Sequence, residues 1–281
     1  MTGFALVILV AVAVVVLLPK SSKNAGSSST SSTTGPSTKP GGSVTGSQQS
    51  STTTTTDPDA GLPALATPTA SDPLRVLDIG DSLGEDLGFQ LETDLPATDV
   101  ATVTMDSKGD TGLANEGYYD WPQNLETDLG TSHAQIVVIF LGANDGQGFD
   151  VNGEPAAFGT GPWIATYTQR VDQMLQESHS AGARVVWVGM PPMQDQALNS
   201  EMQQIDSIFE QQTAKYPGTV YLPSGPVLAP GGQFTFQLET QKGEQTIRTP
   251  DGVHLTSAGA ELLSQAVISA IDARWHLSLK S

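Results

Sequence analysis

The stretch LRVLDIGDSLGED, residues 74–86, decides the fold of this chain. Its first half is largely apolar, as in a strand that is buried on both faces. Its second half places Ser82 between Gly80 and Gly84, and apolar residues then recur with helical spacing. The stretch therefore predicts a strand, a tight turn and a helix. Two interpretations of Ser82 are open: the N-cap of that helix, or a nucleophile held at the end of a sheet.

The sequence beyond residue 73 repeats this alternation of strand and helix signals. Strands are predicted at 74–80, 100–105, 135–142, 183–190 and 219–224, and helices at 83–95, 121–129, 162–182, 198–216 and 256–275. Strands separated by helices indicate βαβ units and a parallel sheet. We therefore expect an α/β fold, a three-layer sandwich with a five-stranded parallel sheet and helices on both faces.

Polar residues are predicted to gather at one edge of this sheet. In an open parallel sheet, ligands bind outside the carboxyl ends of the strands. Three predicted strands are followed there by Asp81-Ser82, by residues 105–111 and by Asn144-Asp145. The segment Thr249-Pro250-Asp251-Gly252-Val253-His254 directly precedes the last predicted helix. The sequence thus places a candidate site at the carboxyl edge.

The residue types at this edge suit nucleophilic catalysis. A serine hydroxyl needs a base to take its proton, a group that orients the base, and donors for the oxyanion. His254 is one of four histidines, and Asp251 stands three residues before it in a tight turn. That spacing lets the carboxylate reach imidazole Nδ1 while Nε2 faces Ser82. Candidate oxyanion donors are the backbone N–H groups of Ser82 and Gly109 and the side-chain amide of Asn144.

Four short blocks carry a resemblance to a known family: Gly80-Asp81-Ser82, Lys108-Gly109-Asp110-Thr111, Gly142-Ala143-Asn144-Asp145 and Asp251-Gly252-Val253-His254. With these blocks in order, residues 74–275 resemble the SGNH hydrolases, the GDSL-type esterase superfamily, in its bacterial extracytoplasmic form. The resemblance implies a flavodoxin-like fold, Ser82 as nucleophile, Asp251 as orienter and His254 as base. It also implies an oxyanion hole of Ser82, Gly109 and Asn144, with no metal and no cofactor.

An alternative is the G-x-S-x-G elbow of α/β-hydrolases, which Gly80-Asp81-Ser82-Leu83-Gly84 also matches. Position argues against it, because that elbow follows several strands and Ser82 follows the first of the domain. The acid and the histidine of α/β-hydrolases usually lie on separate loops, whereas Asp251 and His254 are three residues apart.

Composition excludes several classes of function. The chain has 281 residues, no cysteine and a formal net charge of −18. The charges of the lysines and aspartates in residues 1–72 cancel. The whole negative net charge therefore lies in residues 73–281, which have 27 acidic and 9 basic side chains. Such a surface repels nucleic acid, so we expect no nucleic-acid partner. Without cysteine, and with four scattered histidines, a zinc site is not expected.

The N-terminal part predicts export. Residues 4–18 are uninterruptedly apolar, and we interpret residues 1–20 as a membrane anchor or a cleaved signal segment. Residues 21–72 are rich in Ser, Thr and Pro, which predicts a disordered linker, and residues 73–281 form the catalytic domain. Lys20 and Lys23 after the apolar run favour the opposite orientation. Despite them, we expect a cell-surface or extracytoplasmic protein, anchored or secreted, with a monomeric catalytic domain.

Two insertions flank the predicted site. Residues 146–161 follow Asn144-Asp145, and residues 225–249, with a predicted hairpin around Lys242-Gly243, precede Asp251. Both are polar and glycine-rich, so they shape substrate entry without the apolar entrance that a lipase requires. Asp145 is expected to be a structural hydrogen-bonder. Trp121 has two interpretations, core packing or the lining of a sugar subsite.

These features together predict a serine esterase or O-acyltransferase. It would act through an acyl-enzyme on O-acyl groups of a glycan, with O-acetyl as the first expectation, or on a small acyl ester. One alternative is a general acyl-ester or lipid hydrolase. Another is a non-catalytic cell-wall-binding module on the same frame. The sequence does not separate hydrolysis from transfer, because both use the same acyl-enzyme.

Acidic residues are predicted to crowd the site: Asp78, Asp81, Glu85, Asp86, Asp110 and Asp145 are close in sequence to the motif blocks. Carboxylates near His254 favour its protonated form, which cannot accept the serine proton. We therefore expect activity to fall toward mildly acidic pH.

Overall fold

A computed structural model describes residues 59–279 of the chain. The predicted apolar segment and the predicted linker up to residue 58 lie outside the described residues. Within residues 59–279, no helix is both long enough and apolar enough to span a bilayer.

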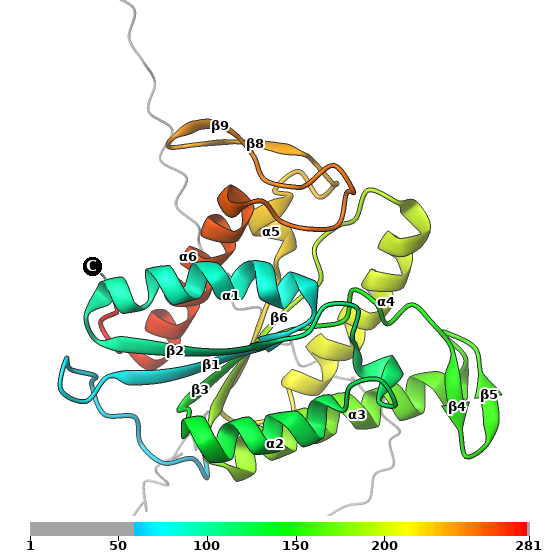
Figure 1. Ribbon diagram of the computed structural model, residues 1–281, viewed down its shortest axis with the longest axis horizontal. Coiled ribbons are helices and arrows are strands. Elements are labelled where there is room, and N and C mark those ends of the chain that lie inside the picture. Colours follow the sequence, from blue (N-terminus) through cyan, green and yellow to red (C-terminus); the bar gives the residue numbers. More distant parts are fainter. Residues whose placement is uncertain (1–58, 280–281) are drawn as a thin grey trace, which may run out of the picture. The chain divides into compact units, whose positions relative to one another are not determined.

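The centre of the domain is a parallel sheet, as predicted. Its strands are β1 (Leu74–Gly80), β2 (Ala101–Ser107), β3 (Ile136–Phe140), β6 (Arg184–Val188) and β7 (Thr219–Leu222), in the spatial order β2-β1-β3-β6-β7 (Figure 1). All four pairings are parallel. The chain leaves β1 toward β2 on one side, and β3 lies on the other side. The topological switch point, where ligands bind in such sheets, therefore lies between β1 and β3.

Helices cover both faces of the sheet. One face carries α1 (Ser82–Asp94) and α6 (Ser257–Trp275), and the other carries α2 (Trp121–Ser132), α3 (Gly161–Ser180) and α4 (Gln196–Thr213) (Figure 1). Short elements are α5 (Gly225–Leu228) and the 3₁₀ turns Pro96–Thr98 and Leu113–Asn115. The predicted three-layer sandwich is confirmed.

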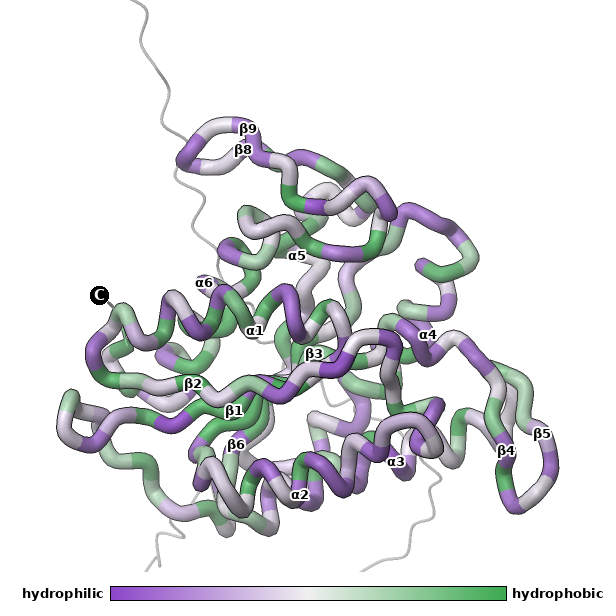
Figure 2. Tube along the Cα trace, viewed as in Figure 1, coloured by the Kyte–Doolittle hydropathy of each residue, from purple (hydrophilic) through white to green (hydrophobic). Residues whose placement is uncertain are grey.

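Burial explains why the central strands are mostly apolar. Every residue of β3 and β6 is buried, whereas the edge strand β2 is largely half-buried or exposed. Hydrophobic residues accordingly concentrate in the strands and on the inward helix faces (Figure 2). Between the sheet and α3, Trp163 stacks on Tyr167 with 4.6 Å between ring centroids. Tyr167 also donates its hydroxyl hydrogen to Asp145, in the loop after β3, at 2.6 Å.

Both insertions contain a hairpin. The predicted hairpin around Lys242-Gly243 is present as β8 (Gln237–Thr240) paired with β9 (Gly243–Thr246). The first insertion, predicted only as a loop, contains β4 (Phe149–Val151) paired with β5 (Glu154–Ala156). Asn152 and Gly153 connect these strands with φ of 55° and 85°, as a type I′ turn requires.

The predicted boundary between linker and domain is corrected by contacts of residues 59–72. Asp59 accepts a hydrogen bond from Arg184 Nε at 2.9 Å and also pairs with Arg274. Arg184 Nη2 donates to the carbonyl of Pro63 at 2.8 Å. Arg184 is buried, so its guanidinium requires these acceptors. The domain therefore includes residues from Asp59 onward.

Candidate active site

Ser82 is the first residue of α1, at the carboxyl end of β1. The N-cap of α1 is Asp81, whose Oδ1 accepts the N–H of Leu83 at 2.9 Å. The Ser82 hydroxyl therefore does not cap the helix and is available for another partner. This geometry rejects the first of the two interpretations of Ser82.

Gly80 allows the turn at Ser82 to pack tightly against β3. A Cβ at position 80 would lie 2.0 Å from the carbonyl oxygen of Phe140, closer than any real contact. The glycine thus brings the ends of β1 and β3, and the loops that follow them, into direct contact.

Asp81 joins those two loops. Its Oδ2 accepts the backbone N–H groups of Gly142 and Ala143, each at 2.9 Å, just before Asn144. Complete burial raises the pKa of Asp81 to about 6, against the lowering effect of these N–H donors. Asp81 is therefore a structural link that holds the Asn144 loop beside Ser82.

His254 and Asp251 lie in a tight turn between β9 and α6. The turn is closed by a hydrogen bond from the Thr249 N–H to the His254 carbonyl at 3.0 Å. Gly252 adopts φ of 74°, and a Cβ there would lie 2.4 Å from Cβ of Gln194. Glycine is required at this position by both conformation and space.

A continuous hydrogen-bonded chain runs from serine to carboxylate. His254 Nε2 lies 2.8 Å from Ser82 Oγ, and His254 Nδ1 lies 2.8 Å from Asp251 Oδ2. The side chains of His254 and Asp251 are 37% and 49% exposed, so the chain opens to solvent. The structure brings together the three residues that the sequence singled out, although Ser82 and His254 are 172 positions apart in the sequence.

Asp251 is held in its ionised form. Its Oδ1 accepts hydrogen bonds from Thr249 Oγ1 at 2.6 Å and from the N–H groups of Val253 and His254 at 2.8 and 3.0 Å. Partial burial acts to raise its pKa, but the bonds from Thr249, His254 and Val253 outweigh it and hold the pKa well below the usual range. An ionised Asp251 can orient the imidazole and stabilise its protonated form.

The predicted oxyanion donors Gly109 and Asn144 follow β2 and β3 at the same edge of the sheet. Asn144 Nδ2 donates one hydrogen to the carbonyl of Thr111 at 2.9 Å, which fixes the amide and leaves its second N–H. A Cβ at Gly109 would meet nothing within 4 Å, so the space beside its Cα is open. Both residues are half-buried at this edge.

Asp145 is a structural hydrogen-bonder, as predicted. It is buried and accepts the N–H groups of Leu113 and Ala114 at 3.0 and 2.8 Å and the Tyr167 hydroxyl at 2.6 Å. Trp121 is 1% exposed, and its Nε1 donates to Thr111 Oγ1 at 3.1 Å. The interpretation of Trp121 as the lining of a sugar subsite is therefore wrong; it is a core residue.

Sequence reasoning missed Arg248, which clamps the histidine turn. Its guanidinium is buried and donates to the carbonyls of Val253 at 2.6 Å and Pro192 at 3.0 Å. It thereby ties the turn to the loop after β6. Burial lowers the pKa of Arg248 to about 10. The available signal was a lone basic residue directly before the Asp251–His254 block.

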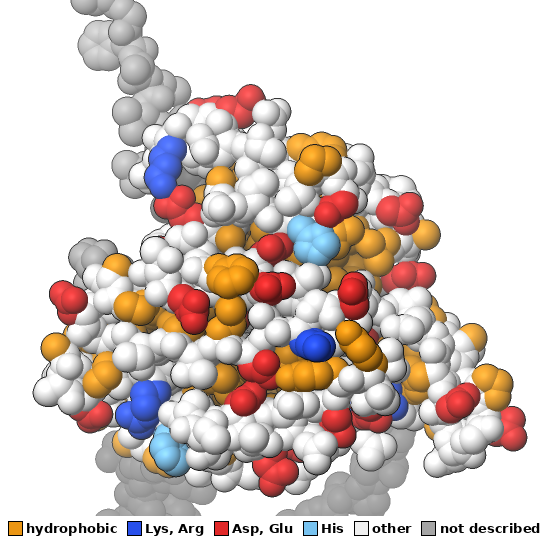
Figure 3. All heavy atoms as spheres, viewed as in Figure 1, with side chains coloured by type: hydrophobic (Ala, Val, Ile, Leu, Met, Phe, Trp, Pro, Cys, Tyr) orange, Lys and Arg blue, Asp and Glu red, His pale blue; other side chains and the backbone are white. Residues whose placement is uncertain are grey.

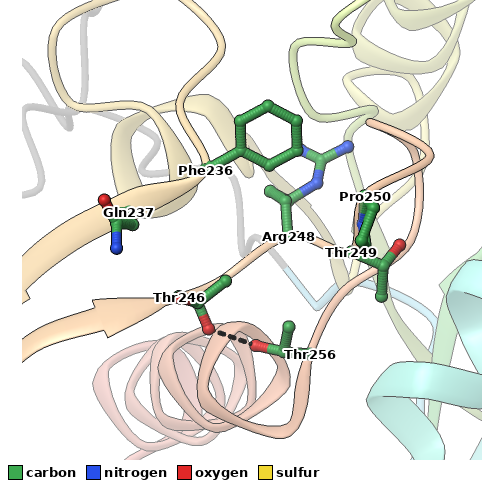
Figure 4. A pocket seen from close by; sticks show the side chains of 7 residues that line it. All are labelled: Phe236, Gln237, Thr246, Arg248, Thr249, Pro250 and Thr256. Atoms are coloured by element: carbon green, nitrogen blue, oxygen red, sulfur yellow. Dashed lines mark hydrogen bonds between the residues drawn. The ribbon is translucent and has the colours of Figure 1, made fainter.

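Arg248 also lines a cavity of about 380 Å³ at the base of the β8–β9 hairpin. Figure 4 shows its guanidinium beside the Phe236 ring, with Thr249 and Pro250 of the histidine turn on the other side. The second insertion is therefore joined to the turn that carries His254.

Only some of the acidic residues predicted to lie near His254 do so. Asp78 is fully buried beneath α1, where burial and Glu92 raise its pKa well above the usual value. Asp81 and Asp145 are also buried and engaged in hydrogen bonds, whereas Asp86 interacts electrostatically with His254. Acidic side chains nonetheless dominate the charged groups on the face that carries α1 and the β8–β9 hairpin (Figure 3). In residues 59–279, no three His, Asp or Glu side chains are grouped to hold a metal ion.

Comparison with solved structures found proteins that share this fold. A GDSL-like lipase from Bacteroides thetaiotaomicron aligns with 75% of this chain and 93% of its own, at 18% identity and a TM-score of 0.50. An alpha/beta hydrolase enzyme from the metagenome of Lake Arreo aligns with 74% of this chain and 97% of its own, at 12% identity and a TM-score of 0.52. At these identities the likeness establishes the fold.

The chain belongs to the family described as protein of unknown function DUF459, which matches residues 75–270. This range runs from β1 into α6 and contains all four motif blocks. A search of curated protein sequences gave no significant match.

Proposed function

We propose that this protein is a serine esterase or O-acyltransferase that forms an acyl-enzyme on Ser82. The observation that carries the proposal is the hydrogen-bonded chain from Ser82 through His254 to Asp251. It lies at the switch point of the sheet, at the same edge as the predicted donors Gly109 and Asn144. A base within hydrogen-bonding distance of a hydroxyl, itself oriented by a carboxylate, is the arrangement that activates serine.

The geometry supports a two-step reaction. His254 Nε2 takes the proton as Ser82 Oγ attacks the ester carbonyl carbon, and Asp251 stabilises the imidazolium that forms. The N–H groups of Ser82, Gly109 and Asn144 stabilise the oxyanion. When the tetrahedral intermediate collapses, the C–O bond to the leaving alcohol breaks and His254 returns the proton to that alcohol. Water or an acceptor hydroxyl then attacks the acyl-enzyme, with His254 again taking and returning the proton.

The proposed substrate is an O-acyl glycan, with O-acetyl as the acyl group. The partial exposure of His254 and Asp251 supports it, because an open site accommodates a large alcohol portion. The polar β8–β9 hairpin beside the site is consistent with a hydrated substrate. A lipid ester is the competing substrate. Comparing acetylated and long-chain esters of one alcohol tests the choice: higher kcat/KM for the long-chain ester would contradict it.

The first test of the proposal is covalent labelling. We expect a fluorophosphonate to react with the wild-type protein and peptide mapping to place the adduct on Ser82, because the reagent traps an activated serine. Hydrolysis of 4-nitrophenyl acetate is expected in parallel. A folded protein that neither labels nor hydrolyses would instead support a non-catalytic cell-wall-binding module.

Asn144→Ala is expected to lower kcat for the acetyl ester by about 100-fold, because it removes a donor aimed at the oxyanion. KM should change little, because that charge develops only in the transition state. Steady-state kinetics check the result. The control is Asn124→Ala on α2, where Asn124 Nδ2 donates to the carbonyl of the N-cap residue Asp120. Equal kcat in the two variants would contradict the assignment of Asn144 as an oxyanion donor.

The proposed location is outside the cytoplasm, with apolar residues 4–18 in the membrane and residues 21–58 as a spacer. The supporting observations are that apolar run and the Ser/Thr-rich sequence after it. We expect the domain to sediment with membranes and to be digested by protease added to intact cells. Its protection under those conditions, with digestion after lysis, would contradict the proposal.

A further inference from the structure

The side chain of Asp86 links the helix that begins at Ser82 to the turn that carries His254. It lies on α1 one helical turn after Ser82. Its Oδ2 accepts the backbone N–H of Leu255, the residue after His254, at 2.8 Å. The contact spans 169 positions in sequence, and Asp86 is half-buried. The helix that begins at Ser82 is thereby tied directly to the turn that carries His254.

The charge of Asp86 also acts on the imidazole. Asp86 interacts electrostatically with His254, Glu85 and Asp251, and Arg248 interacts with Asp86 and Asp251. A carboxylate close to an imidazole favours the protonated form of the ring, and a nearby guanidinium disfavours it. The Asp251 carboxylate is already hydrogen-bonded to His254 Nδ1 and to the backbone N–H of His254. Asp86 is therefore a second carboxylate that acts on His254 separately from Asp251.

We propose that Asp86 is a positioning residue for His254, which fixes the distance from Ser82 to the imidazole and stabilises the imidazolium during the reaction. The proposal rests on the proposed roles of Ser82 and His254. The hydrogen bond to Leu255 supplies the positioning, because the turn cannot move away from α1 without breaking it. The negative charge supplies the stabilisation, because the imidazolium forms only when Ser82 gives up its proton.

Two substitutions separate these contributions. Asp86→Asn keeps an oxygen that can accept the Leu255 N–H but removes the charge. We expect kcat for the acetyl ester to fall about threefold with unchanged KM, and the acid limb of the kcat profile to move to lower pH. Asp86→Ala removes both the charge and the acceptor. It should show the same shift of the acid limb and a fall in kcat of about 30-fold.

An NMR titration of the imidazole tests the electrostatic part without any turnover. Only four histidines are present, and the spectrum of His254→Gln assigns the signal. The His254 midpoint should fall in both Asp86 variants, because both remove a negative charge close to the imidazole. Glu92→Gln, further along α1, is the control and should change neither the midpoint nor kcat.

An Asp86→Asn protein with the wild-type midpoint would overturn the electrostatic role. An Asp86→Ala protein with the kcat of Asp86→Asn would overturn the positioning role. These outcomes differ from a failure of the proposed function, in which Ser82 neither labels nor supports turnover. In that case the titration still decides whether Asp86 acts on His254.

Discussion

Ser82→Ala should abolish fluorophosphonate labelling and lower kcat for 4-nitrophenyl acetate by on the order of 10⁴-fold or more. Serine triads lose about this much when the nucleophile is removed, because oxyanion stabilisation and binding alone remain. The fold should persist, because Asp81 rather than Ser82 caps α1. The thermal unfolding midpoint is therefore expected to stay close to that of the wild type.

A matched control is Ser200→Ala on α4. Its hydroxyl donates to the carbonyl of Gln196, far in sequence from every motif block. This variant should label and turn over substrate like the wild type. Normal turnover by Ser82→Ala, with the fold intact, would refute the nucleophile assignment and the acyl-enzyme with it.

The architecture could be predicted because its signals are local. The run that became β3 is apolar along its whole length, and the run that became β6 is apolar after Arg184, as expected for strands buried on both faces. The pairing of Ser82 with His254 is not a local signal. It could be predicted because parallel strand ends share one edge, and because the resemblance to SGNH hydrolases assigned the roles.

The missed hairpin in the first insertion had a local signal. Asn152-Gly153 is the dipeptide that a type I′ turn favours, and both residues adopt positive φ. The flanking strands have only three residues each, which is too short for a clear alternation of polar and apolar positions. The turn chemistry was therefore the only available evidence.

Other features depend on how distant segments pack. Asp78 has the same sequence neighbourhood as Asp81, yet it is buried beneath α1 while Asp81 binds the loop after β3. The contact of Asp86 with Leu255 exists only once α1 lies beside the turn before α6. A motif fixes which residues carry the chemistry, but long-range packing fixes which of their neighbours support it.

His254→Ala is expected to lower kcat by on the order of 10³-fold or more, because it removes the imidazole placed to take the Ser82 proton, with Nε2 at 2.8 Å from Oγ. Labelling of Ser82 should slow in parallel, since the reagent reports the activated hydroxyl. Asp251→Asn should also lower kcat strongly, because an amide can hold the imidazole in the wrong tautomer.

The control for the loss of a histidine is His133→Ala, which removes an exposed imidazole that ends α2. It should leave kcat unchanged. Because His254 is 37% exposed, the space that its removal leaves is open to solvent, and added imidazole should restore part of the lost activity. Restoration would show that the missing group is a base rather than a structural support. Wild-type kcat in His254→Ala would mean that Ser82 is not activated through this histidine.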